Sequence, residues 1–185
     1  MEYNSIKDLI NMADIHKTTI SDIVIRVEVE DSEFTKNEIE TRMLKQLQVM
    51  KEAVKRGKKG DFSSESGLSG GDALKMLLSP NIMGDRLMRN IMVNALSISE
   101  VNASMGKIVA GPTAGASGII PAVVLALGEK MNLNNDKISL SLFTAAGLGQ
   151  IVANRATLSG AAGGCQAECG AASAMAAGAA AELMG

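Results

Sequence analysis

The two cysteines, Cys165 and Cys169, are the residues whose type and spacing most directly suggest chemistry. Residues four apart share one face of a helix, so both thiols would point the same way. A thiol pair at a glycine-rich helix start is a candidate metal site. The alternative is simple packing, because cysteine is among the most buried residue types. Two thiols fall short of a zinc or iron–sulfur ligand set, and the single histidine, His16, lies far away in sequence, so this chain alone cannot close such a site.

Three glycine-rich stretches accompany the thiols. They cover residues 62–72, 110–121 and 159–165, each at or near the start of an apolar helix. Backbone N–H groups at helix starts bind anions, and glycine allows the unusual backbone angles that such loops need. If the three stretches converge, they form a pocket for a small anion. The first stretch, taken alone, is also typical of a linker in which Asp72 caps a helix over 73–78.

The elements that must position these loops are predicted to be helices. The chain is 46% hydrophobic but has no Trp, one Tyr and three Phe, so twelve Met and many Ala and Gly must fill its core. Apolar periodicity predicts helices over about 5–13, 35–54, 85–105, 121–131 and 136–157. Thr35 and Glu38 form a capping-box signature. Segment 19–31 fits a strand and a helix equally well.

Residues 159–185 combine eleven alanines with six glycines in 27 positions. Alanine favours helix, whereas each interior glycine costs a helix about 1 kcal/mol. This mixture is therefore not suited to an isolated helix. Small side chains instead let the backbone lie very close to a neighbour or to a bound group.

Charge is distributed unevenly along the chain. Residues 1–60 carry 22 of the 38 charged side chains, whereas 101–185 carry eight. We therefore expect one domain of 185 residues with a charged N-terminal helical part (1–60) and an apolar core part (61–185), which this chain or a partner encloses. The net charge of −2 excludes recruitment of nucleic acid by bulk electrostatics.

Cellular location is predicted from three features. The first residues are polar and do not form a signal peptide. Residues 108–128 lack charge, but Pro112, Pro121 and four glycines favour a buried loop and helix over a membrane span. Two cysteines give no disulfide framework, which fits a reducing compartment. We expect a soluble, cytoplasmic protein.

Three motifs resemble a known family. SGLSGGD (66–72), GPTAGASGIIP (111–121) and SGAAGGCQAECG (159–170) resemble, in order, the α chain of the bacterial iron–sulfur-dependent L-serine dehydratases. The likeness extends over essentially the whole chain and includes SDIVIRVE (21–28). It implies an all-α domain and favours helix for 19–31.

The resemblance implies a lyase that converts L-serine to pyruvate and ammonia without pyridoxal phosphate. In this family three cysteines hold a 4Fe–4S cluster, and one iron stays free to act as a Lewis acid on the serine hydroxyl. A base removes the Cα proton, water leaves, and the enamine product hydrolyses. The residues here do not identify the base, and His16 is expected on the surface.

Site residues are carried over by motif. Cys165 stands at the family's first cluster-cysteine position, whereas Cys169 stands where the family often has an apolar residue. Cys169 is therefore predicted to pack, with a redox or repair role as the alternative. For the substrate carboxylate and ammonium, the resemblance suggests Ser66, Gly67, Thr113 and Gly115.

The chain departs from the family pattern in one respect. The other two cluster cysteines would lie beyond Gly185, so we expect a truncated α chain that alone holds no stable cluster. The resemblance also implies a separate β chain and an oligomer. Three alternatives stay open: a related cluster-dependent lyase acting on a small amino acid such as cysteine, a non-catalytic helical module that binds a partner, and a pyridoxal-phosphate enzyme using Lys107.

Overall fold

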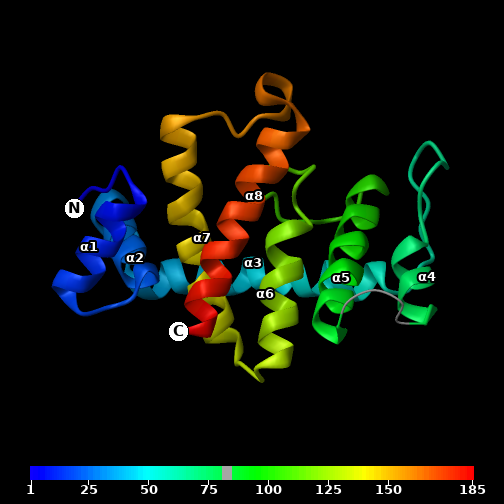
Figure 1. The fold of residues 1–185 in the computed structure, drawn as a ribbon, viewed down its shortest axis with the longest axis horizontal. Coiled ribbons are helices and arrows are strands. Elements are labelled where there is room, and N and C mark those ends of the chain that lie inside the picture. Colours follow the sequence, from blue (N-terminus) through cyan, green and yellow to red (C-terminus); the bar gives the residue numbers. More distant parts are fainter. Residues whose placement is uncertain (81–84) are drawn as a thin grey trace.

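The structure is a computed structural model that describes residues 1–80 and 85–185. These residues form eight α-helices and no β-strand (Figure 1). The helices are α1 (Ile6–His16), α2 (Ile20–Asp31), α3 (Lys36–Gly57), α4 (Asp72–Leu78), α5 (Arg86–Ala103), α6 (Ile119–Lys130), α7 (Asn135–Arg155) and α8 (Gly160–Met184). The all-α prediction is confirmed.

The segment whose pattern was ambiguous is helix α2. Thr19 caps it, because its hydroxyl accepts a hydrogen bond from the Asp22 N–H at 3.2 Å. The apolar residues at 23, 24 and 27 are buried on one face, as the helical period predicts, and Ile25 is buried as well. The capping box of Thr35 and Glu38 is also confirmed at the start of α3.

Two boundaries differ from the predictions. Asp72 does not cap α4: it is the first helical residue, and Gly71 is the N-cap with a φ of 78°. The N–H groups of Asp72 and Ala73 instead donate to Glu100 of α5, at 2.5 and 3.1 Å. The stretch 159–165 is not a loop, since Gly160 already belongs to α8.

Helix α3 runs lengthwise and contacts α2, α5, α6 and α7, with α4 packed on α5 at one end of the molecule and α1 on α2 at the other (Figure 1). The main core lies where α3, α6, α7 and α8 meet. It consists of Leu47, Met50, Ile120, Val124, Leu127, Ile138, Leu142, Ala145, Met175, Ala176, Ala179 and Leu183. Leucine, isoleucine and valine make up most of this core, together with small alanines. Among the described methionines only Met50 and Met175 are buried, so the prediction that methionine fills the core is only partly right.

Small residues allow α7 and α8 to pack closely. A Cβ added at Gly149 would lie 2.7 Å from the Met175 methyl group, and one at Gly178 would overlap Leu148. Ala172 and Ala179 are fully buried. The alanine- and glycine-rich composition therefore serves close helix packing, as the sequence predicts. Within the described residues, no helix is long and apolar enough to cross a membrane.

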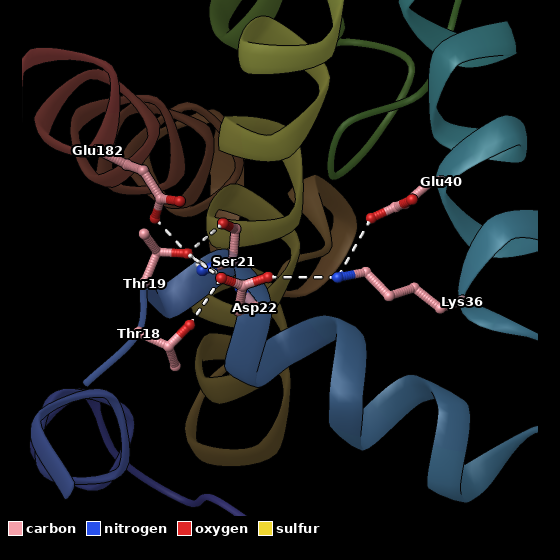
Figure 2. A network of polar contacts seen from close by, with 7 residues as sticks. All are labelled: Thr18, Thr19, Ser21, Asp22, Lys36, Glu40 and Glu182. Atoms are coloured by element: carbon pink, nitrogen blue, oxygen red, sulfur yellow. Dashed lines mark hydrogen bonds and ion pairs between the residues drawn. The ribbon is translucent and has the colours of Figure 1, made fainter. Parts of the chain in front are cut away.

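The C-terminal end of α8 is tied to α2 and α7 by one carboxylate. Glu182 accepts a hydrogen bond from the Ser21 N–H at 3.3 Å and another from the Thr144 hydroxyl. Figure 2 shows Glu182 above the first turn of α2, close to Ser21 and Thr19. These contacts hold the C-terminal end of α8 against α2 and α7.

Candidate functional site

The thiol pair lies where α8 changes direction. Gly164 has φ 76° and ψ 171°, values outside the helical region, so regular helix resumes at Cys165. The Sγ atoms of Cys165 and Cys169 are 3.7 Å apart on one helix face. Cys165 is exposed and Cys169 is half-buried. The hydrogen bond between the two thiols raises the pKa of Cys169 above its usual value.

Glu168 lies on the same turn and connects it to the loop of residues 104–118. The Thr113 hydroxyl donates a hydrogen bond to Glu168 Oε1 and accepts one from the Ala116 N–H at 3.3 Å. Two glycines make room for the carboxylate. A Cβ at Gly115 would lie 2.6 Å from Oε1, and a Cβ at Gly160 would lie 2.6 Å from Oε2.

The predicted residues Thr113 and Gly115 are therefore brought to the turn that carries Cys165. Their loop is anchored from α5, because Asn102 Nδ2 donates to the Ala114 carbonyl at 3.1 Å. Behind it, Gly118 packs against the α5 backbone, where an added Cβ would be 2.8 Å from the Ala95 carbonyl oxygen. This combination of a half-buried carboxylate, a hydroxyl, one exposed thiol and one half-buried thiol is the strongest candidate site in the described residues.

Ser66 and Gly67 lie elsewhere. Both are exposed in the connection 58–71, which Figure 1 shows at the far edge of the molecule beyond α5, away from the start of α8. The loop satisfies its own N–H groups: Ser69 N–H donates to Ser64 Oγ at 3.2 Å, and Gly67 N–H donates to the Ser64 carbonyl at 2.8 Å. The structure therefore does not bring the three glycine-rich stretches together into one pocket.

The sequence reasoning missed Glu168. The signal was present, because a residue three positions after Cys165 shares its helix face. Its hydrogen-bond partner Thr113, however, is 55 positions away, and no local pattern predicts that contact. His16 is exposed at the end of α1, as expected, and Lys107 is exposed in the loop before α6.

Comparison with known proteins assigns the chain to a family. The model of the family described as serine dehydratase alpha chain matches residues 15–185. The chain belongs to the serine dehydratase alpha chain family. The resemblance predicted from its three motifs is thus confirmed.

Several curated relatives carry the same name. The chain is 42% identical to the "Probable L-serine dehydratase, alpha chain" of Bacillus subtilis, over 99% of this chain and 62% of that protein. It is 40% identical to the L-serine dehydratase alpha chain of Peptoniphilus asaccharolyticus, over 98% of this chain and 63% of that protein. It is 34% identical to L-serine dehydratase TdcG of Escherichia coli, over 100% of this chain and 42% of that protein. No solved structure matches it significantly.

The donor set at the α8 turn can be compared with what an iron–sulfur cluster requires. Such clusters are held by several cysteine thiolates, and this chain has two cysteines. Among residues 1–80 and 85–185, no three His, Cys, Asp or Glu side chains meet in a way that could hold a metal ion. The exposed Cys165 suits one ligand position, and the described residues do not complete the set.

Proposed function

We propose that this chain is part of an L-serine dehydratase that releases pyruvate and ammonia from L-serine. Its site is formed where α8 begins, and residues 1–185 act as one catalytic domain. The observation that carries the proposal is the Glu168 carboxylate, held by Thr113 one turn from Cys165, in a chain of the serine dehydratase alpha chain family. Because the chain spans about three fifths of the first relatives' length, further parts of the enzyme are needed.

Glu168 and Thr113 bind the ammonium end of the substrate. A carboxylate pairs well with an ammonium group through a charge-assisted hydrogen bond. The Thr113 hydroxyl occupies Oε1, which fixes the side chain, and leaves Oε2 for the substrate. Gly115 and Gly160 support this role, since any side chain at either position would displace the carboxylate.

Ser66 and Gly67 remain candidates for binding the substrate carboxylate. This part of the proposal requires the loop of residues 58–71 to move toward α8 when substrate binds. The anchors of the loop lie at its ends: Arg56 stacks on the Phe62 ring, and Glu100 holds the first N–H groups of α4. Residues 63–70 lie between these anchors and are held together by hydrogen bonds from the Ser69 and Gly67 N–H groups to Ser64, so they would have to move as one unit.

Cys165 is proposed as one ligand of a 4Fe–4S cluster. When bound, such a cluster offers a Lewis-acidic iron for the substrate hydroxyl, which is otherwise a poor leaving group. The remaining ligands have to come from outside the 185 residues, because Cys169 is the chain's only other thiol. A β chain is the expected partner, in an oligomer in a reducing cytoplasm, since relatives of this chain are named alpha chains.

The test is product formation by the protein purified without oxygen, together with any chain that co-purifies. We expect pyruvate from L-serine, with slower turnover of L-threonine and L-cysteine. Faster turnover of L-cysteine would establish the cysteine lyase instead. Borohydride treatment should leave activity intact, and labelling of Lys107 by borohydride would establish pyridoxal phosphate chemistry. Absence of any product, with iron and partner present, would favour the non-catalytic module.

A further inference from the structure

The two thiols are close enough to react with each other. Their Sγ atoms are 3.7 Å apart, and both side chains are at least partly accessible to solvent. Neither thiol is joined by enough further ligands in the described residues to hold a metal ion. When no metal is bound, thiol–disulfide chemistry is the reaction that an accessible dithiol can undergo.

A bond between them requires the first turn of the helix to tighten. Residues four apart in a regular helix have Cα atoms about 6 Å apart, which lies within the range of about 4.4–6.8 Å found for disulfides. Their Cβ atoms, however, are about 5–6 Å apart, whereas a disulfide needs a separation of about 3.5–4.5 Å. Rotation about the side-chain bonds can therefore close only part of the 3.7 Å between the sulfur atoms, and the backbone at Cys165 must shift by about 1–2 Å to supply the rest.

The break at Gly164 makes this turn adaptable. Regular helix starts at Cys165, so a disulfide to Cys169 spans its first turn and not its middle. No atom lies within 4 Å of a Cβ placed at Gly164 or at Gly170, so there is open space on both sides of the pair. Small backbone adjustments here cost little packing.

We propose that Cys165 and Cys169 form a reversible intrahelical disulfide, and that this turn is a redox modification site. The oxidant is a low-molecular-weight disulfide such as oxidised glutathione. The thiolate of the exposed Cys165 attacks one of its sulfurs and displaces one glutathione thiolate, which takes up a proton. Cys169, having lost its own proton, attacks the mixed disulfide at the Cys165 sulfur and releases the second glutathione. Two protein thiols lose two electrons and two protons, and one small disulfide becomes two thiols.

The disulfide has a consequence that rests on the proposed function. If Cys165 is a cluster ligand, the disulfide and the iron compete for the same sulfur. The oxidised chain would then take up no iron until a thiol reductant reopened the bond. Cys169 would thereby protect Cys165 from irreversible oxidation to the sulfinic acid while no cluster is bound.

The experiment incubates the iron-free protein with increasing ratios of oxidised to reduced glutathione, and then counts free thiols and measures intact mass. Wild type should lose both free thiols, and its mass should fall by two hydrogen atoms per chain with no covalently bound glutathione. Dithiothreitol should restore both thiols. The single variants Cys165→Ser and Cys169→Ser should instead gain one glutathione. Wild type that gains glutathione or keeps both thiols would overturn the proposal.

A matched control keeps two thiols and changes only their relative position. In the double variant Cys169→Ser, Gly170→Cys, the second thiol lies about 140° around the helix from Cys165. This variant should form mixed disulfides only, and an internal disulfide in it would show that helix geometry is not the cause. Iron uptake is measured separately, in the protein together with its co-purifying chains. Uptake by oxidised wild type equal to that of the reduced protein would leave the disulfide standing but remove Cys165 from the proposed ligands.

Discussion

Glu168 depends on residues that are distant from it in sequence. Thr113 donates to its carboxylate, and the absence of side chains at Gly115 and Gly160 leaves the space that the carboxylate occupies. A fixed carboxylate loses little conformational freedom when it binds a cation, so more of the interaction energy appears as affinity. Glu168 is therefore the most informative single residue to change.

We expect Glu168→Gln to raise the KM for L-serine by about 10–100-fold, because a hydrogen bond between charged groups contributes about 1.5–3 kcal/mol. The amide is the same size but carries no charge to attract the ammonium group. Steady-state kinetics of pyruvate release would measure the change. The matched control is Glu182→Gln, at the other end of α8, which should leave KM unaltered. Equal KM values for wild type and Glu168→Gln would contradict the role.

Part of this site could be predicted from sequence. The glycine- and hydroxyl-rich pattern around Thr113 and Gly115 indicated a special loop, and the structure brings that loop to the thiol turn. Ser66 and Gly67 have the same local pattern but lie at the far edge of the molecule (Figure 1). Which loops meet depends on how the helices pack, and that information is not local.

Helices α3 and α5 come very close together at a glycine, Gly57. A Cβ at Gly57 would lie 2.5 Å from Ser97 Cα and 2.6 Å from its carbonyl carbon, both backbone atoms. Backbone cannot rotate away as a side chain can, so the two helices would have to separate. This contact fixes α5, which in turn positions α4 and the loop of residues 104–118.

Gly57→Ala is therefore expected to lower the free energy of unfolding by about 1–3 kcal/mol, through overpacking. Gly170→Ala serves as the comparison, because Gly170 is an exposed helical glycine with open space around its Cβ position. That change should stabilise the protein by up to about 1 kcal/mol, since alanine favours helix. Urea unfolding followed by circular dichroism measures both. If both substitutions changed the free energy of unfolding in the same direction and by the same amount, close packing between α3 and α5 would not explain the glycine at position 57.

Helix positions were mostly predictable, and their ends less so. The capping box of Thr35 and Glu38 is local and was read correctly. The start of α4 was not, because its N–H groups are bound by Glu100, 27 and 28 positions away. The glycines of 159–165 predict a loop, yet the stretch is helical from Gly160 up to the break at Gly164, and the absence of a side chain at Gly160 leaves room for Glu168.

A network of polar contacts at the start of α2 links several helices that are distant in sequence (Figure 2). Asp22 accepts hydrogen bonds from the hydroxyls of Thr18 at 2.7 Å and Thr19 at 3.1 Å, and Lys36 of α3 lies 3.6 Å away. The Thr18 hydrogen bond is the main cause that lowers the pKa of Asp22 below its ordinary value of 3.8. The network thus connects the turn between α1 and α2 with α2 and α3, while Glu182 adds α7 and α8.

The lowered pKa predicts how stability depends on pH. Because the folded state favours the ionised carboxylate, its contribution is fully present above the unfolded pKa and is lost as pH falls through the folded pKa. Asp22 is partly exposed, so the contribution is at most about 1 kcal/mol. The difference in unfolding free energy between wild type and Asp22→Asn should be constant near neutral pH and shrink below about pH 4. A difference that grew as pH fell would contradict this assignment.

We propose that the α8 turn carrying Cys165 belongs to the catalytic site of a serine dehydratase. Pyruvate formation from L-serine by Cys165→Ser, compared with Cys169→Ser, tests it most directly, in protein purified without oxygen with its co-purifying chains. Circular dichroism should show that both variants keep their helix content. We predict no pyruvate from Cys165→Ser and continued turnover by Cys169→Ser. Turnover by Cys165→Ser at the wild-type rate would contradict the account.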